Sequence, residues 1–154
     1  MEIYQLLSPE SVVANLKANS KKQALQELSA RASKLTGQHE RVIFDTLLER
    51  ERLGTTGVGN GIAIPHGRLQ GLDKLYGLFA RLDRPVDFDS IDEMPVDLIF
   101  LLLAPESAGA DHLKALARVS RLLRDKAICE KLRGAENGDA LYALLTDSPA
   151  SHAA

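Results

Sequence analysis

The chain has 154 residues and a mass of 16.8 kDa, from which we expect one domain with a hydrophobic core and no second full domain. A formal net charge of -2 at pH 7 gives no electrostatic reason to expect nucleic acid or a membrane surface as a partner. With one cysteine, Cys129, and no signal peptide or membrane-spanning run, we expect a cytoplasmic protein without an internal disulfide.

The first part of the chain predicts a strand followed by a helix. Residues 12–17 read as a strand, and Ser20 begins the capping-box pattern S-x-x-Q, which is typical of a helix start. We expect this helix to continue to about Thr36, with Gly37 as its C-terminal stop. Its apolar residues recur at helical spacing and predict an inward face, made of Ala24, Leu25, Leu28, Ala32 and Leu35.

A second helix is predicted for residues 38–53, with Gly54 as its stop. At about 100° per residue, Arg50 falls on the inward face of this helix, whereas Glu49, Glu51 and Arg52 point to its flanks or outward. The other residues expected on the inward face are Val42, Ile43, Thr46, Leu47 and Leu53. Arg50 is the one charged residue on that face, so it requires an explanation.

A glycine-rich segment follows, and it leads to a histidine. Glycines at 57, 59 and 61 permit positive φ angles, so the loop containing Gly57, Gly59, Asn60 and Gly61 could turn successive N–H groups toward an anion. Residues 62–64 then read as a short buried strand, after which a proline and His66 follow. Gly67 leaves room beside the imidazole, so we expect His66 to be presented rather than buried.

The remaining elements predict a layered α/β domain. Residues 75–82 and 96–104 read as strands buried on both faces, separated by a turn at residues 84–89. Three helical segments follow, at residues 111–124, 128–132 and 141–145. The predicted order is β-α-α-β-β-β-α-α-α, in one domain over residues 1–147 with a loose tail at residues 148–154.

Each candidate functional residue has a plain structural interpretation. Arg50 could complement the negative end of its helix or pair with a carboxylate, but its planar fork is equally suited to a phosphoryl group. His112 shares an apolar stripe at the start of its helix, where an anion is favoured, or it could simply be satisfied by water or Asp111. His39 and His152 are interpreted as structural.

Other kinds of site are poorly supported. Two histidines and an arginine do not form a metal site, because no third ligand has suitable spacing and a guanidinium would repel the ion. The sequence has no G-x-S-x-G elbow, no Walker A motif and no dinucleotide fingerprint. We therefore expect no metal and no cofactor.

Arg50, the run Gly57–Gly67 and His112 together resemble the enzyme IIA domains of the mannitol/fructose type from the bacterial phosphotransferase system, over nearly the whole chain. The resemblance implies a three-layer sandwich with a mixed sheet of about five strands between helical layers. It also implies that a small histidine phosphocarrier protein phosphorylates His66 at Nε2, with Nδ1 held by a backbone carbonyl and with Arg50 and His112 flanking the imidazole. The loop glycines and Gly67 would complete the phosphoryl pocket.

Within this family the chain looks most like the nitrogen-regulatory branch. That branch implies a phosphocarrier that controls other proteins, such as potassium transport components or sensor kinases, through its phosphorylation state. The alternative is a sugar-specific enzyme IIA subunit that passes phosphoryl groups to an enzyme IIB during uptake. A third hypothesis is a protein-interaction module in which His66 has no chemical role, but an inward Arg50 without a counter-ion would then be costly.

Overall fold

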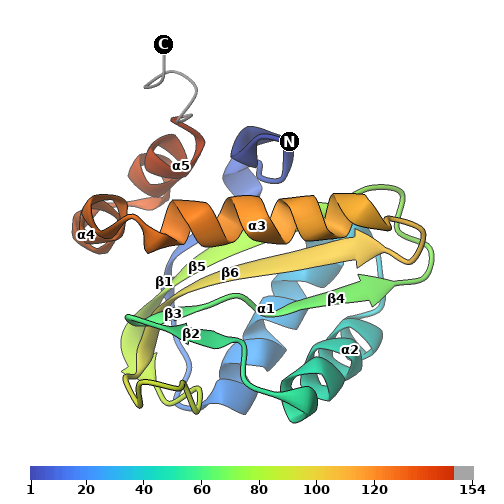
Figure 1. The fold of residues 1–154 in the computed structure, drawn as a ribbon, viewed down its shortest axis with the longest axis horizontal. Helices are drawn as coiled ribbons and strands as arrows, with labels where there is room; N and C mark the ends of the chain where they lie inside the picture. Colours follow the sequence, from blue (N-terminus) through green and yellow to red (C-terminus); the bar gives the residue numbers. More distant parts are fainter. Residues whose placement is uncertain (148–154) are drawn as a thin grey trace.

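The structure is a computed structural model that describes residues 1–147, and it has helices on both faces of a mixed sheet (Figure 1). No helix in this part of the chain has the length and apolar character needed to cross a membrane. The elements, in chain order, are η1 (Ile3–Gln5), η2 (Pro9–Ser11), β1 (Val12–Leu16), α1 (Lys21–Thr36), α2 (Glu40–Leu53), β2 (Gly57–Gly59), β3 (Ile62–Ala63), β4 (His66–Leu69), β5 (Tyr76–Val86), β6 (Val96–Pro105), α3 (Ala110–Arg124), α4 (Lys126–Gly134) and α5 (Gly138–Thr146).

Strand β6 is the centre of the sheet, whose order is β1-β5-β6-β3-β2. One side of β6 pairs antiparallel with β5, which in turn pairs parallel with β1. The other side pairs parallel with two short strands in succession: Ile62 of β3 lies opposite Leu98, and His66 of β4 lies opposite Leu102. Ile64 and Pro65 therefore separate the two short strands that pair with β6.

The core has two halves because β6 is buried on both faces, as predicted. Side chains at alternate positions of a strand point to opposite faces. Ile99 and Leu101 pack with the helices α1 and α2, while Phe100 and Leu102 pack on the other face with α3, α4 and α5. Cys129 lies buried in this second half as a free thiol.

The expected α/β order is confirmed, but the sheet has six strands rather than about five. Neither β2 nor β4 was predicted as a strand. Strand β5 also continues to Val86, through residues that were expected to form a turn. Pro85 is tolerated there because the pairing between β5 and β6 shifts register between Arg81 and Val86, where a missing N–H does little harm.

Helix α1 forms for the reasons that its sequence indicates. The Ser20 side chain accepts a hydrogen bond from the Gln23 N–H (3.1 Å), and the Gln23 side chain accepts one from the Asn19 N–H (2.6 Å). Gly37 ends the helix with φ of 74°, a conformation that glycine adopts without strain. Of the predicted inward residues, Ala24, Leu25, Leu28 and Ala32 are buried, and Leu35 is partly buried.

Two residues expected on the inward face of α2 are exposed, with exposed fractions of 51% for Val42 and 86% for Leu53. In α3, Leu113 is likewise 66% exposed. Helix α2 buries a narrower stripe than its sequence suggests, with Ile43 and Leu47 as its buried apolar residues. Leu53 and Leu113 lie at the end of α2 and the start of α3, where a helix has neighbours on fewer sides. The tail at residues 148–154, with His152, lies outside the described residues.

Candidate functional site

His66 is held in a defined orientation by the backbone on which it lies. Its Nδ1 lies 2.9 Å from the carbonyl oxygen of Ile64. The N–H of Ile64 donates to the Thr56 carbonyl (2.9 Å), and the Pro65 carbonyl accepts from the Leu102 N–H (3.0 Å). Because the partner of Nδ1 is a carbonyl, which can only accept, Nδ1 carries the proton. Nε2 is therefore left with a lone pair.

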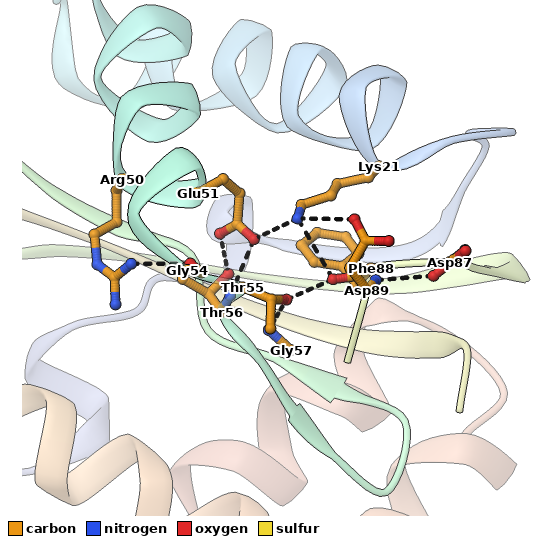
Figure 2. Close-up of polar contacts among 10 residues, drawn as sticks. All are labelled: Lys21, Arg50, Glu51, Gly54, Thr55, Thr56, Gly57, Asp87, Phe88 and Asp89. Atoms are coloured by element: carbon orange, nitrogen blue, oxygen red, sulfur yellow. Dashed lines mark hydrogen bonds and ion pairs between the residues drawn. The ribbon is translucent and has the colours of Figure 1, made fainter. Parts of the chain in front are cut away.

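Arg50 lies in the last turn of α2 and contacts that lone pair. Its Nε donates to His66 Nε2 at 3.3 Å, and its Nη1 donates to the Gly54 carbonyl at 3.0 Å. Figure 2 shows the guanidinium beside Gly54, on the opposite side of the helix end from Glu51. The helical phase of Arg50 thus directs its side chain to the histidine, as the inward position on α2 suggested.

His112 is the third member of the group. It lies in the first turn of α3 with 5% of its surface exposed, and its ring centroid is 5.8 Å from that of His66 in an edge-to-face arrangement. Arg68 Nε donates to His112 Nδ1 at 3.1 Å, so the His112 proton resides on Nε2. That buried Nε2–H has no hydrogen-bond partner within residues 1–147 and is thus a free donor.

Sequence reasoning missed Arg68. A signal for it existed, since Arg68 lies two residues after His66 and side chains two apart in a strand share a face. The missing information was that residues 66–69 form a strand.

His66 lies in an open groove that is also lined by Arg50, Arg52 and Arg68. Glu49 is the one acidic residue of this lining. Three guanidinium groups against one carboxylate favour an anion in this groove.

The structure does not bring the tip of the glycine loop, at Gly59, Asn60 and Gly61, to His66. Strands β2 and β3 form a hairpin whose central residues, Asn60 (φ of 57°) and Gly61 (φ of 81°), have the positive angles typical of a type I′ turn. The Asn60 N–H donates to Asp92 Oδ2 (2.8 Å), and the Gly57 N–H donates to Thr55 Oγ1 (3.0 Å).

The hairpin tip also lies far along the sheet from the histidine. Ile62, next to the tip, pairs with Leu98 of β6, while His66 pairs with Leu102, four residues further on. At about 3.3 Å per residue, this separation is about 13 Å. Gly59, Asn60 and Gly61 therefore do not form a phosphoryl-binding loop around His66.

Gly67 directly follows His66 in β4 and permits a close contact between β4 and α2. A Cβ atom on Gly67 would lie 2.7 Å from Thr46 Cγ2.

We expect Gly67→Ala to lower the free energy of unfolding by about 1–3 kcal/mol, measured by urea denaturation. Adding Thr46→Ser, which removes the methyl group but keeps the hydroxyl bonded to the Val42 carbonyl, should restore most of the loss. A Gly67→Ala protein as stable as its parent would contradict this packing.

The prediction that Glu51 points to the flank of its helix or outward is wrong, because the residue is buried. Glu49 and Arg52 are exposed as expected, but only 7% of the Glu51 surface is accessible. Its carboxylate forms an ion pair with Lys21 Nζ (2.8 Å) and accepts hydrogen bonds from the N–H and hydroxyl of Thr56 (Figure 2). These partners lie on other segments, so the phase of α2 alone could not indicate them.

Both imidazoles of the site have lowered pKa values. Burial lowers the pKa of His66 below 6.5, and the Arg50 charge adds to this, against the opposing effects of the Ile64 carbonyl and Glu51. Burial also lowers the pKa of His112, as do the charges of His66 and Arg68. A lowered pKa means that both rings are neutral at pH 7, so His66 Nε2 is available as a nucleophile.

This gives a pH prediction. In a nuclear magnetic resonance titration of the imidazole Cε1 protons, we expect the midpoints of His66 and His112 both to lie below 6.5. Since the neutral ring is the reactive form, nucleophilic activity of His66 should be constant from pH 8 to near 7 and should fall once the pH drops through its pKa. A midpoint at or above 6.5 for His66 would contradict the burial and charge balance described here.

His39, interpreted from the sequence as structural, caps α2, with its Nδ1 accepting from the Arg41 N–H (3.2 Å). Within residues 1–147, no three His, Cys, Asp or Glu side chains are grouped so that they could hold a metal ion. The group that the fold does assemble is thus a neutral histidine with a lone pair, a guanidinium on that lone pair, and a second histidine whose N–H donor has no partner among the described residues. Such a group is suited to binding and transferring an anionic group.

Comparisons with known proteins agree with this chemistry. Residues 5–148 match the family model described as "Phosphoenolpyruvate-dependent sugar phosphotransferase system, EIIA 2". The chain is 62% identical to a nitrogen regulatory protein of Bradyrhizobium diazoefficiens over 99% of this chain and 100% of that protein. For the nitrogen regulatory protein of Escherichia coli K12 the identity is 40%, over 96% of this chain and 91% of the relative.

The chain is also similar to a solved structure of a nitrogen regulatory protein. The crystal structure of the nitrogen regulatory protein IIA-Ntr from Neisseria meningitidis superposes with a TM-score of 0.88 at 36% identity, covering 94% of this chain and 99% of that one. The family match spans nearly all of the described residues and includes Arg50, His66 and His112. The chain belongs to the EIIA type 2 family of the phosphoenolpyruvate-dependent phosphotransferase system.

Proposed function

We propose that His66 accepts a phosphoryl group at Nε2 from the phosphohistidine of a small histidine phosphocarrier protein. The observation that carries this proposal is the pair of contacts on the two ring nitrogens: Nδ1 on the Ile64 carbonyl and Nε2 facing Arg50. In the transfer a P–N bond forms at His66 Nε2 as the P–N bond of the donor histidine breaks. The His66 proton stays on Nδ1, where the carbonyl stabilises the charge that the ring acquires.

Arg50 and His112 would stabilise the transferred group. When the phosphoryl group occupies the place beside Nε2, the Arg50 guanidinium can donate to its oxygens instead of to the ring, without moving the helix. The Nε2–H of His112, which has no hydrogen-bond partner within residues 1–147, is a further donor, and Arg68 keeps its proton on that nitrogen. Little covalent chemistry is required of the protein, since phosphoryl transfer depends mainly on positioning and charge stabilisation.

We propose a regulatory role for the phosphorylated protein, because its relatives are regulatory proteins. The relatives with the highest identities reported above are named nitrogen regulatory proteins, and one of them matches this chain over its full length. In this proposal the phosphorylation state of His66 controls binding to other proteins, such as potassium transport components or sensor kinases. Phosphorylation would replace an uncharged, arginine-facing imidazole by a dianionic group in the groove, which changes the charge that a partner meets.

The direct test is labelling. The protein is incubated with phosphoenolpyruvate, enzyme I and the histidine phosphocarrier, and the modified residue is located by mass spectrometry under alkaline conditions, where phosphohistidine persists. We expect one phosphoryl group per chain, on His66. A folded protein that takes no label, or that takes it on another residue, would overturn the proposal.

A second measurement separates the regulatory role from a sugar-specific enzyme IIA role. The phosphorylated protein is mixed with a fructose- or mannitol-specific enzyme IIB, and loss of label from His66 is followed in time. We expect this transfer to be slow compared with return of the phosphoryl group to the histidine phosphocarrier. Transfer to the enzyme IIB at the faster rate would favour the sugar-specific role instead.

A further inference from the structure

The buried carboxylate of Glu51 has no part in the chemistry proposed above, although it directly follows Arg50 in the chain. Its side chain is 3% exposed. Oε1 accepts from the Thr56 N–H (3.0 Å) and lies 2.8 Å from Lys21 Nζ, while Oε2 accepts from the Thr56 hydroxyl. A carboxylate is this deeply buried only where its charge is compensated, and here one lysine and two hydrogen bonds do so.

These contacts join four segments of the chain (Figure 2). Lys21 is the first residue of α1, and its ammonium group also lies 3.4 Å from the Phe88 carbonyl and 3.6 Å from Asp89 Oδ2, in the loop after β5. The Thr55 hydroxyl donates to the same Phe88 carbonyl. Glu51 thus lies where the start of α1, the end of α2, the entry to β2 and the loop after β5 meet.

Two short paths lead from this junction to the reactive imidazole. On one side, Gly54, two residues before Thr56, offers its carbonyl to Arg50 Nη1 (3.0 Å). On the other side, the Thr56 carbonyl accepts the Ile64 N–H (2.9 Å), and the Ile64 carbonyl holds His66 Nδ1 (2.9 Å). Fixing Thr56 therefore fixes the backbone that orients both members of the Arg50–His66 pair.

We propose that Glu51 is a positioning residue for this site: by holding Thr56 against the last turn of α2, its carboxylate sets the orientation of His66 and the reach of Arg50. This inference rests on the proposed role of His66 as phosphoryl acceptor. A group misplaced by about 1 Å can slow a reaction that depends on positioning by about 100-fold, so the restraint matters even though Glu51 does not touch the reacting atoms.

The charge of Glu51 also acts on His66 through space. Its negative charge raises the pKa of His66, against the effects of burial and of Arg50. The charged or titratable groups that face this imidazole are Arg50 and Glu51 from α2, His112 from α3 and Arg68 from β4, and Glu49 and Arg52 of α2 line the same groove. Removing the carboxylate charge should therefore lower the His66 pKa further, whatever happens to the rate.

The test uses Glu51→Gln in the full chain, with Asp89→Asn as its matched control. Glutamine keeps the size of the side chain, but its amide cannot accept from the Thr56 N–H, the Thr56 hydroxyl and Lys21 together. Asp89 also pairs with Lys21, but its side chain is 76% exposed and does not contact Thr56. Both substitutions remove one negative charge near Lys21, and only the first releases Thr56.

With the phosphorylated histidine phosphocarrier as the donor, we expect Glu51→Gln to lower kcat for labelling by roughly 10- to 100-fold. The KM for the donor should stay unchanged, because Glu51 is buried away from the surface that a donor protein would contact. The His66 titration midpoint should fall, and Asp89→Asn should match the parent in all three measurements. Thermal unfolding verifies that each protein is folded.

Two outcomes would overturn the positioning role: a Glu51→Gln protein with the parental kcat, or a Thr56→Val protein with the parental kcat. If Glu51→Gln does not fold, Thr56→Val, which removes one hydrogen bond and keeps the carboxylate, must still lower kcat. Failure of the proposed function is distinct, because parental His66 would then take no label at all. The titration of the unphosphorylated variants measures the effect of the Glu51 charge on His66 in either case.

Discussion

A His66→Ala protein is expected to take no phosphoryl group under conditions that label the parent chain completely. Alanine has no nucleophile, and the remaining site histidine cannot replace it, because His112 Nδ1 accepts from Arg68 and its Nε2 carries the proton. Deletion of a residue that forms the covalent intermediate typically costs 10⁴-fold or more in rate. The labelling rate should therefore fall at least about 10⁴-fold.

The fold should survive this substitution. His66 is only partly buried, and its loss leaves β4 paired with β6 through backbone hydrogen bonds. We expect the free energy of unfolding to change by less than about 2 kcal/mol, measured by urea denaturation. His39→Ala is the matched control, since it deletes an exposed imidazole at the start of α2 and should label as the parent does. Equal labelling of His66→Ala and the parent would rule out His66 as the acceptor.

The helices and the directions of their side chains could be predicted, because they depend on residues that are close together in the chain. The serine cap, the apolar stripe and the terminal glycine of α1 lie within one segment, and they identify the helix without knowledge of its neighbours. The same helical phase put Arg50 and His112 on inward faces, and the structure brings both to His66. A side chain on a regular helix has a direction that sequence spacing determines, so these positions could be predicted.

Two of the short strands could not be predicted in this way. The apolar run at residues 62–64 did indicate β3, but β2 has three residues and β4 has four, which is too few for a period-2 pattern, and β4 exists because β6 lies beside it. The glycine-rich segment was predicted to bind an anion, although its sequence also contains the signal for a hairpin turn. Asn60-Gly61 between short extended runs is typical of a type I′ hairpin, so these residues turn the chain rather than bind an anion.

Glu51 shows why buried charges are difficult to predict from sequence. Its position on α2 suggested a flank, and a carboxylate is normally exposed unless it is paired. The pairing depends on Lys21, thirty residues earlier, and on a turn that brings Thr56 back to the helix end. Only tertiary structure supplies those partners, so the contacts of Glu51 with Lys21 and Thr56 could not be inferred before the fold was known.

Arg50→Ala is expected to reduce the rate of phosphoryl acceptance by about 10²- to 10³-fold while the protein stays folded. A donor aimed at the charge that develops in a transition state is worth about this much when it is deleted. Arg50 contacts His66 Nε2 through Nε and the Gly54 carbonyl through Nη1, so the fork is already held beside the reacting nitrogen. The measurement is single-turnover labelling by the phosphorylated histidine phosphocarrier.

Arg52→Ala is the matched control for net charge. Arg52 lies two residues further along the same helix, is exposed and lines the same groove, so its removal takes away one positive charge without removing the fork on His66. We expect Arg52→Ala to slow labelling by less than about 10-fold, as screened surface charges do. If both variants slowed labelling equally, the general charge of the groove would explain the effect, and a specific role for Arg50 would be excluded.

Arg50→Lys separates geometry from charge at the same position. Lysine keeps the positive charge but lacks the planar fork that can bridge two phosphoryl oxygens. We expect its labelling rate to lie between those of the parent and Arg50→Ala, and its phosphohistidine to hydrolyse faster than that of the parent. A parental rate in Arg50→Lys would show that one point charge beside Nε2 is sufficient. Loss of folding in Arg50→Ala, seen by circular dichroism, would instead make Arg50 a structural residue.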